Sequence, residues 1–412
     1  MVATFYYQNN IINMKKLTSI IALSLLPVTL SAQSFTLSGR FPGLTEGAKV
    51  VVKAKSDVMT QTVAEGIVKN GAFKVSGKLD KPTVCTLAID DRVPKNQEDY
   101  PQDRGVSFMA DNVAMTVSAP HFDSIPRNYE MGGVPMLHEK NVTVTGGKFQ
   151  DEYNEWRKAV YDSNLAYALA GQKLWKYKFG SDNPGKANYD TSREKELEDN
   201  ERKALETFDK ANDAFIAAHP TYAISLYLQS KKLDNVFRYT DEELDSLLNA
   251  FKSNGDKAGY SDFEEKVKAY RPYAKGLDYK DIYLQTTDGK AARLKDYIVA
   301  GKYNIIDFWA SWCGPCRLAI PHVKRLHEEH PEVNIISISC DRSLTDWAQA
   351  IDEEKMPWAQ AVLSPDKVKN KAASAAYRIQ FIPYLIIINP QGKIIYATNS
   401  ADEVISKIAA TL

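Results

Sequence analysis

Two cysteines three positions apart, Cys313 and Cys316, are the residues of this chain best suited to covalent chemistry. They follow an apolar run, residues 305–309, and Gly314 and Pro315 stand between them. Glycine and proline here are typical of the first turn of a helix, where proline is tolerated because its missing N–H would be unpaired. Unpaired N–H groups and the positive end of the helix dipole favour thiolate over thiol. The pair therefore predicts a dithiol that closes and reopens a disulfide.

The order of the two cysteines predicts their roles. Cys313 comes first and should be the better exposed thiol, so we expect it to attack a substrate disulfide. Cys316 lies one turn further into the helix and should resolve the mixed disulfide that results. A permanent structural disulfide is the alternative for this pair, but a strained, exposed pair at a helix start is the labile kind.

A zinc site that combines the two cysteines with His327 and His330 is a further alternative. His327 lies eleven residues beyond Cys316 on the same expected helix. At a rise of 1.5 Å per residue this separation is roughly 16 Å, whereas zinc–sulfur bonds are only about 2.3 Å long. We therefore expect no metal and no cofactor, and we place His322, His327 and His330 on the surface of the helix.

The run from Asp307 to Cys316, DFWASWCGPC, resembles the active site of thioredoxin. The resemblance covers roughly residues 277–412 and implies an α/β thioredoxin fold with a central mixed sheet flanked by helices. Within this superfamily of AhpC/TSA-type proteins, the chain is most similar to the TlpA/ResA-like exported thiol–disulfide oxidoreductases. The residues implied to support the cysteines are Trp312, Gly314 and Pro315.

Asp307 and Pro383 are the other two residues for which the resemblance implies a catalytic role. Asp307 lies in the apolar run, and a buried carboxylate without a charged partner should have a raised pKa. The corresponding Asp of thioredoxin exchanges a proton with the second cysteine. Pro383 corresponds to the cis-proline that faces the two cysteines. An Asp that points to water and an ordinary trans-proline remain the alternatives at these positions.

The chain departs from the TlpA/ResA-like branch just after the cysteines. The motif of that branch continues Cys-x-x-Glu-x-Pro, and here Ala319 holds the Glu position ahead of Pro321. Alanine cannot move protons, so Asp307 is the acid–base candidate that remains. A role in cytochrome maturation, borrowed from that branch, is in doubt for the same reason.

Composition and charge limit the remaining functional classes. The chain has 52 basic and 52 acidic residues, so no net charge favours a nucleic-acid partner. Only four cysteines are present, which is too few for a disulfide framework in 412 residues. Cys85 and Cys340 lie in or at the end of apolar runs, where a free cysteine is usually a packed core residue.

Residues 14–32 have the pattern of a secretory signal peptide. Lys15 and Lys16 precede a short apolar stretch that ends in small residues at Ala32. We expect residues 1–32 to be an upstream extension plus this signal, with Met14 as the better initiator and cleavage after Ala32. A membrane anchor is the alternative, but the apolar stretch is short for a span. The signal predicts a periplasmic or cell-envelope protein.

The rest of the chain divides by pattern. Residues 33–148 alternate like the strands of a small antiparallel β module, with a hairpin at Asn70-Gly71, and resemble a module found ahead of thioredoxin domains in Bacteroides-type bacteria. Residues 149–275 read as helical, and Thr240 and Ser261 each precede a Glu by three residues, which predicts capping boxes. Residues 277–412 alternate strand and helix.

These patterns predict an exported enzyme that reduces protein disulfides. Its partners would be disulfide-bearing proteins and an upstream dithiol electron donor, expected to be membrane-bound. A disulfide oxidase or isomerase with the same site is one alternative, and a partner-binding protein that carries a thioredoxin domain is another. A thiol peroxidase is disfavoured because its Thr or Ser and its Pro are replaced by Ala310 and Ile306.

Overall fold

The computed structural model describes residues 34–411, apart from 56–59, 91–102, 128–133, 135, 186–187, 189 and 256–257. The expected signal peptide therefore lies outside the described residues. Within them, no helix combines the length and the apolar character that crossing a membrane requires.

Residues 35–145 form two four-stranded sheets that enclose one hydrophobic core. The strands are β1 (Phe35–Arg40), β2 (Lys49–Ala54), β3 (Gln61–Ile67), β4 (Ala72–Gly77), β5 (Thr83–Asp90), β6 (Arg104–Ala110), β7 (Ala114–Ser118) and β8 (Thr143–Thr145). Their orders are β4-β1-β7-β8 and β3-β2-β5-β6. The pairing is antiparallel as expected, except that β1 and β7 run parallel.

The expected Asn70-Gly71 hairpin is wrong in one respect. Both residues have positive φ, at 52° and 67°, as the two-residue turn requires. However, β3 and β4 belong to different sheets and are joined at the turn by a single bridge between Lys69 and Ala72. The turn therefore carries the chain from one sheet of the module to the other.

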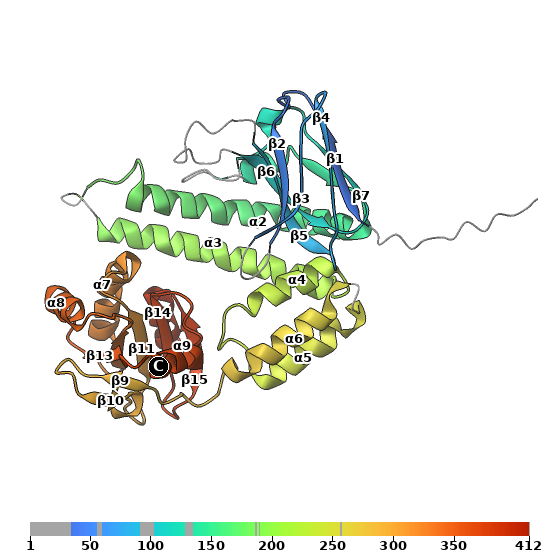
Figure 1. Cartoon of the computed structure of the whole chain (residues 1–412). Coiled ribbons are helices and arrows are strands. Elements are labelled where there is room, and N and C mark those ends of the chain that lie inside the picture. The colour runs from blue at the N-terminus through green and yellow to red at the C-terminus, as the bar shows by residue number, and fades with distance from the viewer. Residues whose placement is uncertain are drawn as a thin grey trace, which may run out of the picture. The chain divides into compact units, whose positions relative to one another are not determined.

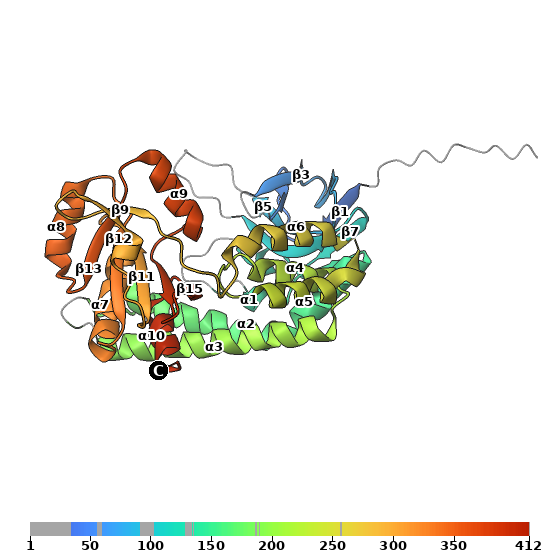
Figure 2. The same cartoon turned by 90° about the horizontal axis from the view of Figure 1, so that it is seen from below.

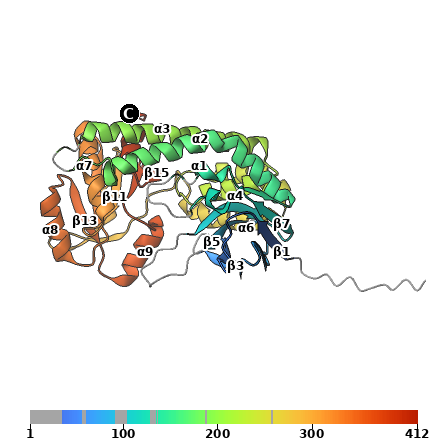
Figure 3. The same ribbon diagram turned by 90° about the horizontal axis from the view of Figure 1, so that it is seen from above.

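Two long helices, α2 (Lys148–Phe179) and α3 (Thr191–Ala218), follow the short helix α1 (Met136–Glu139). Figures 1 and 3 both show α2 and α3 side by side along their length. Asp190 caps α3 by accepting hydrogen bonds from the backbone N–H groups of Ser192 and Arg193. The break between the helices falls where the sequence predicts it, in a segment with glycine and proline.

Three shorter helices complete the helical segment: α4 (Ala223–Lys232), α5 (Asp241–Phe251) and α6 (Tyr260–Tyr270). Thr240 and Glu243 form the expected capping box at the start of α5. The second expected box is wrong, because α6 begins at Tyr260, after Gly259 in the left-handed conformation. Ser261 therefore lies inside the first turn rather than at the cap.

The C-terminal part is a seven-stranded mixed sheet with helices on both faces, which confirms the expected thioredoxin-like fold class. Its elements are β9 (Tyr283–Gln285), β10 (Ala291–Arg293), β11 (Asn304–Trp309), α7 (Gly314–Glu329), β12 (Asn334–Ser339), α8 (Leu344–Glu354), β13 (Ala359–Leu363), α9 (Lys367–Tyr377), β14 (Tyr384–Ile388), β15 (Ile394–Thr398) and α10 (Ala401–Ala409). The strand order is β10-β9-β13-β12-β11-β14-β15. Strand β13 was not anticipated from the sequence.

The central strand β11 is buried on both faces, as its uninterrupted apolar run predicts. Ile305 and Trp309 point into a core built with α7, α8 and α10, and Figure 2 shows α7 and α10 next to each other beside the strands. Ile306 and Phe308 point into the opposite core, which includes α9 and apolar residues of α4, α5 and α6. Asp307 alternates with Ile306 and Phe308, so it lies on the α7 face of the sheet.

Candidate active site

Cys313 is the N-cap residue of α7, and its side chain takes the place of the usual hydroxyl or carboxylate. The Sγ atom of Cys313 accepts a hydrogen bond from the backbone N–H of Cys316 at 3.1 Å. In the structure the two cysteines are joined by a disulfide, with Cα atoms 5.2 Å apart. After reduction the same N–H group, and the positive end of the helix, favour the thiolate of Cys313 over its thiol.

The expected difference in exposure between the two cysteines is small. Cys313 is 5% exposed and Cys316 is 2% exposed. Cys313 is therefore the better exposed of the two, as expected, but only slightly, and both residues are buried. What distinguishes Cys313 is its place at the N-cap, where its sulfur accepts the backbone N–H of Cys316, a group that has no partner within the helix. Trp312, one residue earlier, is 70% exposed.

Pro383 lies opposite the cysteines, at the start of β14. The Ile382–Pro383 peptide bond is cis, as the resemblance implies. The carbonyl oxygen of Ile382 lies 3.7 Å from Sγ of Cys313. A disulfide sulfur has no proton to donate, so in the oxidised form this is only a contact. In the dithiol form the S–H group of Cys313 can donate a weak hydrogen bond to the carbonyl oxygen of Ile382.

Asp307 is buried beneath α7, as expected from the sequence. It is 4% exposed, and its neighbours in register are Ser337 on β12 and Leu385 on β14. Burial raises the pKa of Asp307 from 3.8 to about 6, and a hydrogen bond from Ser337 opposes this shift. The carboxyl group can therefore change its protonation state close to neutral pH.

The loop before Cys313 is fastened by Asp341, a residue that sequence reasoning missed. Its carboxylate accepts hydrogen bonds from the backbone N–H and the hydroxyl of Ser311, at 2.8 and 2.6 Å, and from the hydroxyl of Ser339 at 2.6 Å. Arg317 adds a second tie, since its Nε donates to the carbonyl oxygen of Ser311 at 2.8 Å. These bonds fix the chain on the N-terminal side of the disulfide.

A signal for these missed residues is present in the sequence. Ser337, Ser339 and Asp341 recur at every second position at the end of an apolar strand. Alternation of this kind places all three side chains on the same face of the sheet as Ile335, which packs under α7. Polar residues on a buried strand face need partners there, so the pattern indicates a buried polar network.

The other two cysteines are free. Burial raises the pKa of both the Cys85 and the Cys340 thiol to about 12; for Cys85 the charge of Lys55 opposes the shift, and for Cys340 the charges of Asp341 and Asp307 add to it. Thiolate is therefore scarce at both positions near neutral pH, which disfavours both as nucleophiles.

The three histidines of α7 are partly buried rather than on its surface, which corrects the expectation. The Nδ1 atom of His322 lies 3.0 Å from a carboxylate oxygen of Asp402, and the ring of His327 packs 5.7 Å from that of Trp358. His330 is the C-cap residue of the helix. Asp402 of α10 and the ring of Trp358 lie against the first two of these histidines and cover part of the helix surface there.

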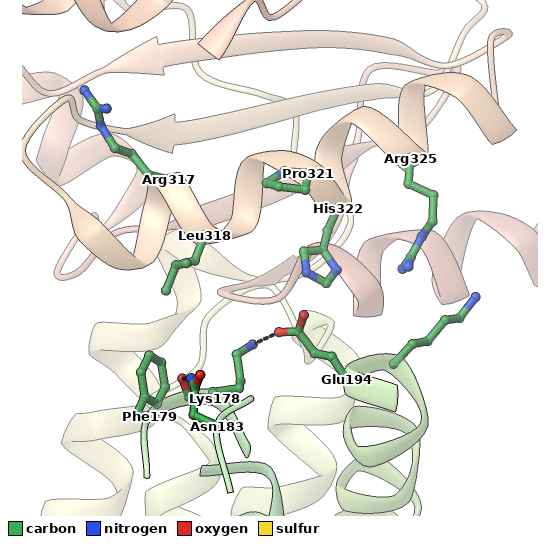
Figure 4. A pocket seen from close by; sticks show the side chains of 10 residues that line it. Lys178, Phe179, Asn183, Glu194, Arg317, Leu318, Pro321, His322 and Arg325 are labelled. Atoms are coloured by element: carbon green, nitrogen blue, oxygen red, sulfur yellow. Dashed lines mark hydrogen bonds and ion pairs between the residues drawn. The ribbon is translucent and has the colours of Figure 1, made fainter. Parts of the chain in front are cut away.

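A cavity of about 640 Å³ lies beside α7 (Figure 4). Leu318 of α7 and Phe179 of α2 stand on opposite walls in this view, and both are more than half exposed. Lys178 binds Glu194 and Glu198 at 2.6 and 3.0 Å at the same place. A smaller cavity that shares Lys178, Phe179, Leu318 and His322 extends to Pro315 and Pro383.

One group of side chains in this region has the spacing of a metal site. Glu194, Glu198 and His322 offer ligand atoms within 4.8 Å of one another. Both carboxylates already bind the ammonium group of Lys178, which supplies the positive charge that an ion would bring. We therefore assign no metal to these residues.

Comparison with known proteins gives two family matches. Residues 301–394 match a family described as thioredoxin-like, and residues 35–153 match a domain of unknown function, DUF4369. These matches confirm the resemblance expected for the C-terminal domain and identify the N-terminal module as a recurring domain.

Individual relatives cover only part of the chain. Nucleoredoxin of Mus musculus is 34% identical over 106 residues, which are 25% of this chain and 24% of that protein. The chain thus spans about a quarter of the length of the nucleoredoxins that it matches. The thiol-disulfide oxidoreductase ResA of Oceanobacillus iheyensis is 28% identical over 137 residues, 32% of this chain and 68% of that protein.

Two of the solved structures that resemble this chain each align with one third of it. One is the thioredoxin domain of a thiol-disulfide oxidoreductase from Bacteroides vulgatus, at 29% identity and a TM-score of 0.30, covering 33% of this chain and 96% of that one. Another is a thiol-disulfide oxidoreductase from Bacteroides fragilis, at 24% identity and a TM-score of 0.30, covering 33% and 100%.

Proposed function

We propose that this chain, whose C-terminal domain is thioredoxin-like, is an exported thiol–disulfide oxidoreductase that reduces protein disulfides through Cys313 and Cys316. The observation that carries the proposal is the position of Cys313. Its sulfur accepts the N–H of Cys316 at the start of α7 and lies beside the carbonyl oxygen of Ile382. A thiolate held there is stabilised by the helix start and lies next to the backbone of Ile382 and Pro383, along which an extended substrate strand is proposed to bind.

The reaction has two exchange steps. The thiolate of Cys313 attacks one sulfur of a substrate disulfide, forms a mixed disulfide and releases the other substrate sulfur as a thiolate. Cys316 then loses its proton and attacks Sγ of Cys313, which forms the observed Cys313–Cys316 bond and releases the second substrate thiolate. The substrate gains two electrons and the dithiol loses two. An upstream dithiol, expected to be membrane-bound, must return them.

Asp307 is the proposed base for the second step. Cys316 is buried, and burial disfavours its thiolate, so a nearby proton acceptor is needed. Asp307 lies under the helix that carries Cys316, and its pKa of about 6 leaves it ionised at neutral pH yet able to take a proton. Pro383 is proposed to align the substrate strand opposite the thiols.

The signal peptide expected at residues 14–32 supports a periplasmic or cell-envelope location for this activity. Disulfides persist in such compartments, so a dedicated reductase has substrates there. The relative named as the thiol-disulfide oxidoreductase ResA supports the same reaction class.

Insulin reduction, followed with dithiothreitol as donor, tests the proposal. Cys313→Ser should abolish activity, whereas Cys316→Ser should form covalent adducts with disulfide proteins and stop there. Cys85→Ala, which removes a buried thiol far from the site in sequence, is the control and should remain active. Adducts with Cys313→Ser but not with Cys316→Ser would reverse the roles, and no reduction by the wild type would refute the activity.

The direction of the reaction is tested by the reduction potential of the pair. We expect a value near that of reducing thioredoxins, about −270 mV, rather than that of strong oxidants, about −120 mV. Equilibration of the full chain with glutathione buffers measures it directly. A reduction potential near that of the strong oxidants would instead indicate an oxidase that uses the same two cysteines.

A further inference from the structure

A chain of buried polar side chains extends from Asp307 across the sheet. Ser337 of β12 has no exposed surface, and its Oγ lies 2.7 Å from Oδ2 of Asp307. Trp358, just before β13, is 8% exposed, and its Nε1 lies 2.8 Å from Oγ of Ser337. Neither Ser337 nor Trp358 has a part in the reaction described above.

The chemistry of the three groups fixes the direction of these hydrogen bonds. An indole N–H can only donate, so Oγ of Ser337 must accept from Trp358. A hydroxyl has a single proton, and with Trp358 acting as donor that proton points to Asp307. Trp358 therefore orients the hydroxyl of Ser337 so that the ionised Asp307 faces a donor.

This donor matters because Asp307 has few other means of remaining ionised. Among the described residues, no Lys, Arg or His forms an ion pair with it, and burial favours its neutral form. The hydrogen bond from Ser337 is the interaction that favours the carboxylate. A hydrogen bond to a charged acceptor is stronger than one to a neutral acceptor, so it acts selectively on the ionised state.

Three elements pack around Asp307, namely α7, β12 and β14, and two of them supply titratable groups. Cys316 lies on α7, and Cys340 lies at the end of β12, where the charge of Asp307 contributes to its raised pKa. The residue of β14 in register with Asp307 is Leu385, which does not titrate. His327 of α7 packs against the ring of Trp358 rather than against Asp307.

We propose that Ser337 and Trp358 are positioning residues that hold Asp307 as a carboxylate ready to accept the proton of Cys316. This inference rests on the proposed function, because the proton of Cys316 is transferred in the resolving step of the proposed dithiol reaction. In the resolving step the proton moves from Cys316 to Asp307, a bond forms between the sulfurs of Cys316 and Cys313, and the bond from Cys313 to the substrate sulfur breaks. The electron pair of the broken bond leaves on the substrate thiolate.

The direct test is a titration of Asp307 in the full chain with its disulfide closed, followed by NMR of ¹³C-labelled carboxyl groups. Ser337→Ala should move the midpoint upward by about one pH unit, because it removes a hydrogen bond to a charged group. Trp358→Phe should give a smaller upward shift, because the hydroxyl remains but is no longer oriented. Ser337→Thr keeps the hydroxyl and should restore the wild-type midpoint.

Two matched controls lack these hydrogen bonds. Trp347 is buried in the same core, and its Nε1 has no acceptor among the described residues; Ser225 of α4 is buried with an Oγ that likewise has no described partner. Trp347→Phe and Ser225→Ala should therefore leave the midpoint of Asp307 unchanged. Superimposable titrations of wild type and Ser337→Ala would overturn the proposal, as would equal shifts in the controls.

Kinetics extend the test to the reaction. Resolution of a mixed disulfide at pH 6 should slow about fivefold in Ser337→Ala, and its rate should approach that of the wild type by pH 8.5, because the fraction of ionised Asp307 recovers. The first attack by Cys313 should be unchanged. A slowing that is equal at all pH values would show a purely structural role. A wild type that forms no mixed disulfide would refute the proposed function, while the titration would still decide whether Ser337 and Trp358 hold the carboxylate.

Discussion

The carboxylate of Asp341 accepts two hydrogen bonds from Ser311, one from the backbone N–H at 2.8 Å and one from the hydroxyl at 2.6 Å. The two residues are 30 positions apart in the chain, and Ser311 stands two residues before Cys313. The end of β12 is thereby tied to the loop that leads into the disulfide. Local helix geometry alone cannot fix that loop, so the placement of Cys313 depends on this long-range contact.

Replacement of Asp341 by Ala should loosen the loop and destabilise the domain. Three hydrogen bonds to a buried carboxylate are lost, and the N–H of Ser311 is left without this acceptor. We expect the free energy of unfolding to fall by about 2–4 kcal/mol, and disulfide reduction to slow. Urea unfolding and insulin reduction measure both effects. Asp352→Ala, an exposed acidic residue of α8, is the control, and equal stability of the two variants would contradict this role.

Asp307→Asn should slow the resolving step much more than the first attack. Asparagine cannot accept the proton of Cys316, and a positioned base contributes about 10²–10⁴-fold. The deficit should be largest near neutral pH and should shrink at alkaline pH, where Cys316 ionises without help. Pre-steady-state resolution of mixed disulfides against pH measures this. If wild type and variant give the same profile, Asp307 is a structural residue.

The same carboxyl group should make stability depend on pH. Its pKa is about 6 in the folded chain, against 3.8 for an unperturbed aspartic acid, so the folded state binds the extra proton between these values. Stability should therefore fall as the pH rises from about 4 to about 6, by up to about 3 kcal/mol, and stay lower above that range. Asp307→Asn should remove this loss. Urea unfolding at pH 4.5 and 7.5 compares the two, and parallel pH dependence would be the contrary result.

The pair of His322 and Asp402 should also make stability fall as the pH rises, but in a higher pH range. The hydrogen bond to Asp402 raises the pKa of His322, so the folded chain holds the proton more tightly than the unfolded chain. The stabilisation is complete below the pKa of an unfolded histidine, about 6.5, and is lost as the pH rises through the folded value. His322→Gln should cost roughly 1 kcal/mol at pH 5.5 and less at pH 8.5. A loss that is equal at both pH values would contradict the ionic pairing.

Much of the site follows from local sequence. The apolar run before Cys313 predicts a buried strand, and β11 is buried on both faces. The Gly-Pro pair predicts a helix start, and α7 begins at Gly314. The burial of Asp307 follows from its place in that run, because both faces of a continuous apolar strand are covered, including the face to which Asp307 points. Each of these predictions depends on neighbours in the chain.

Other local patterns lead to errors where a distant element decides the outcome. The Asn70-Gly71 turn has the predicted conformation, but whether its flanking strands pair depends on two sheets that other strands complete. Ser261 has the pattern of a cap, but Gly259 adopts a left-handed conformation and starts α6 earlier. Strand β13 is short, and it is recognisable mainly through its pairing with β12.

The sequence by itself determined the Cys313–Cys316 pair, its strand and helix, and the buried acid beneath them, since all of these lie within one short stretch and obey strand and helix periodicity. Only the tertiary structure decided which groups surround that acid and hold the loop. Ser337 reaches Asp307 because β11 and β12 pair in parallel with these two residues in register, and a shift of one residue would turn the hydroxyl to the other face of the sheet. Trp358 and Asp341 depend in the same way on contacts 21 and 30 residues away along the chain.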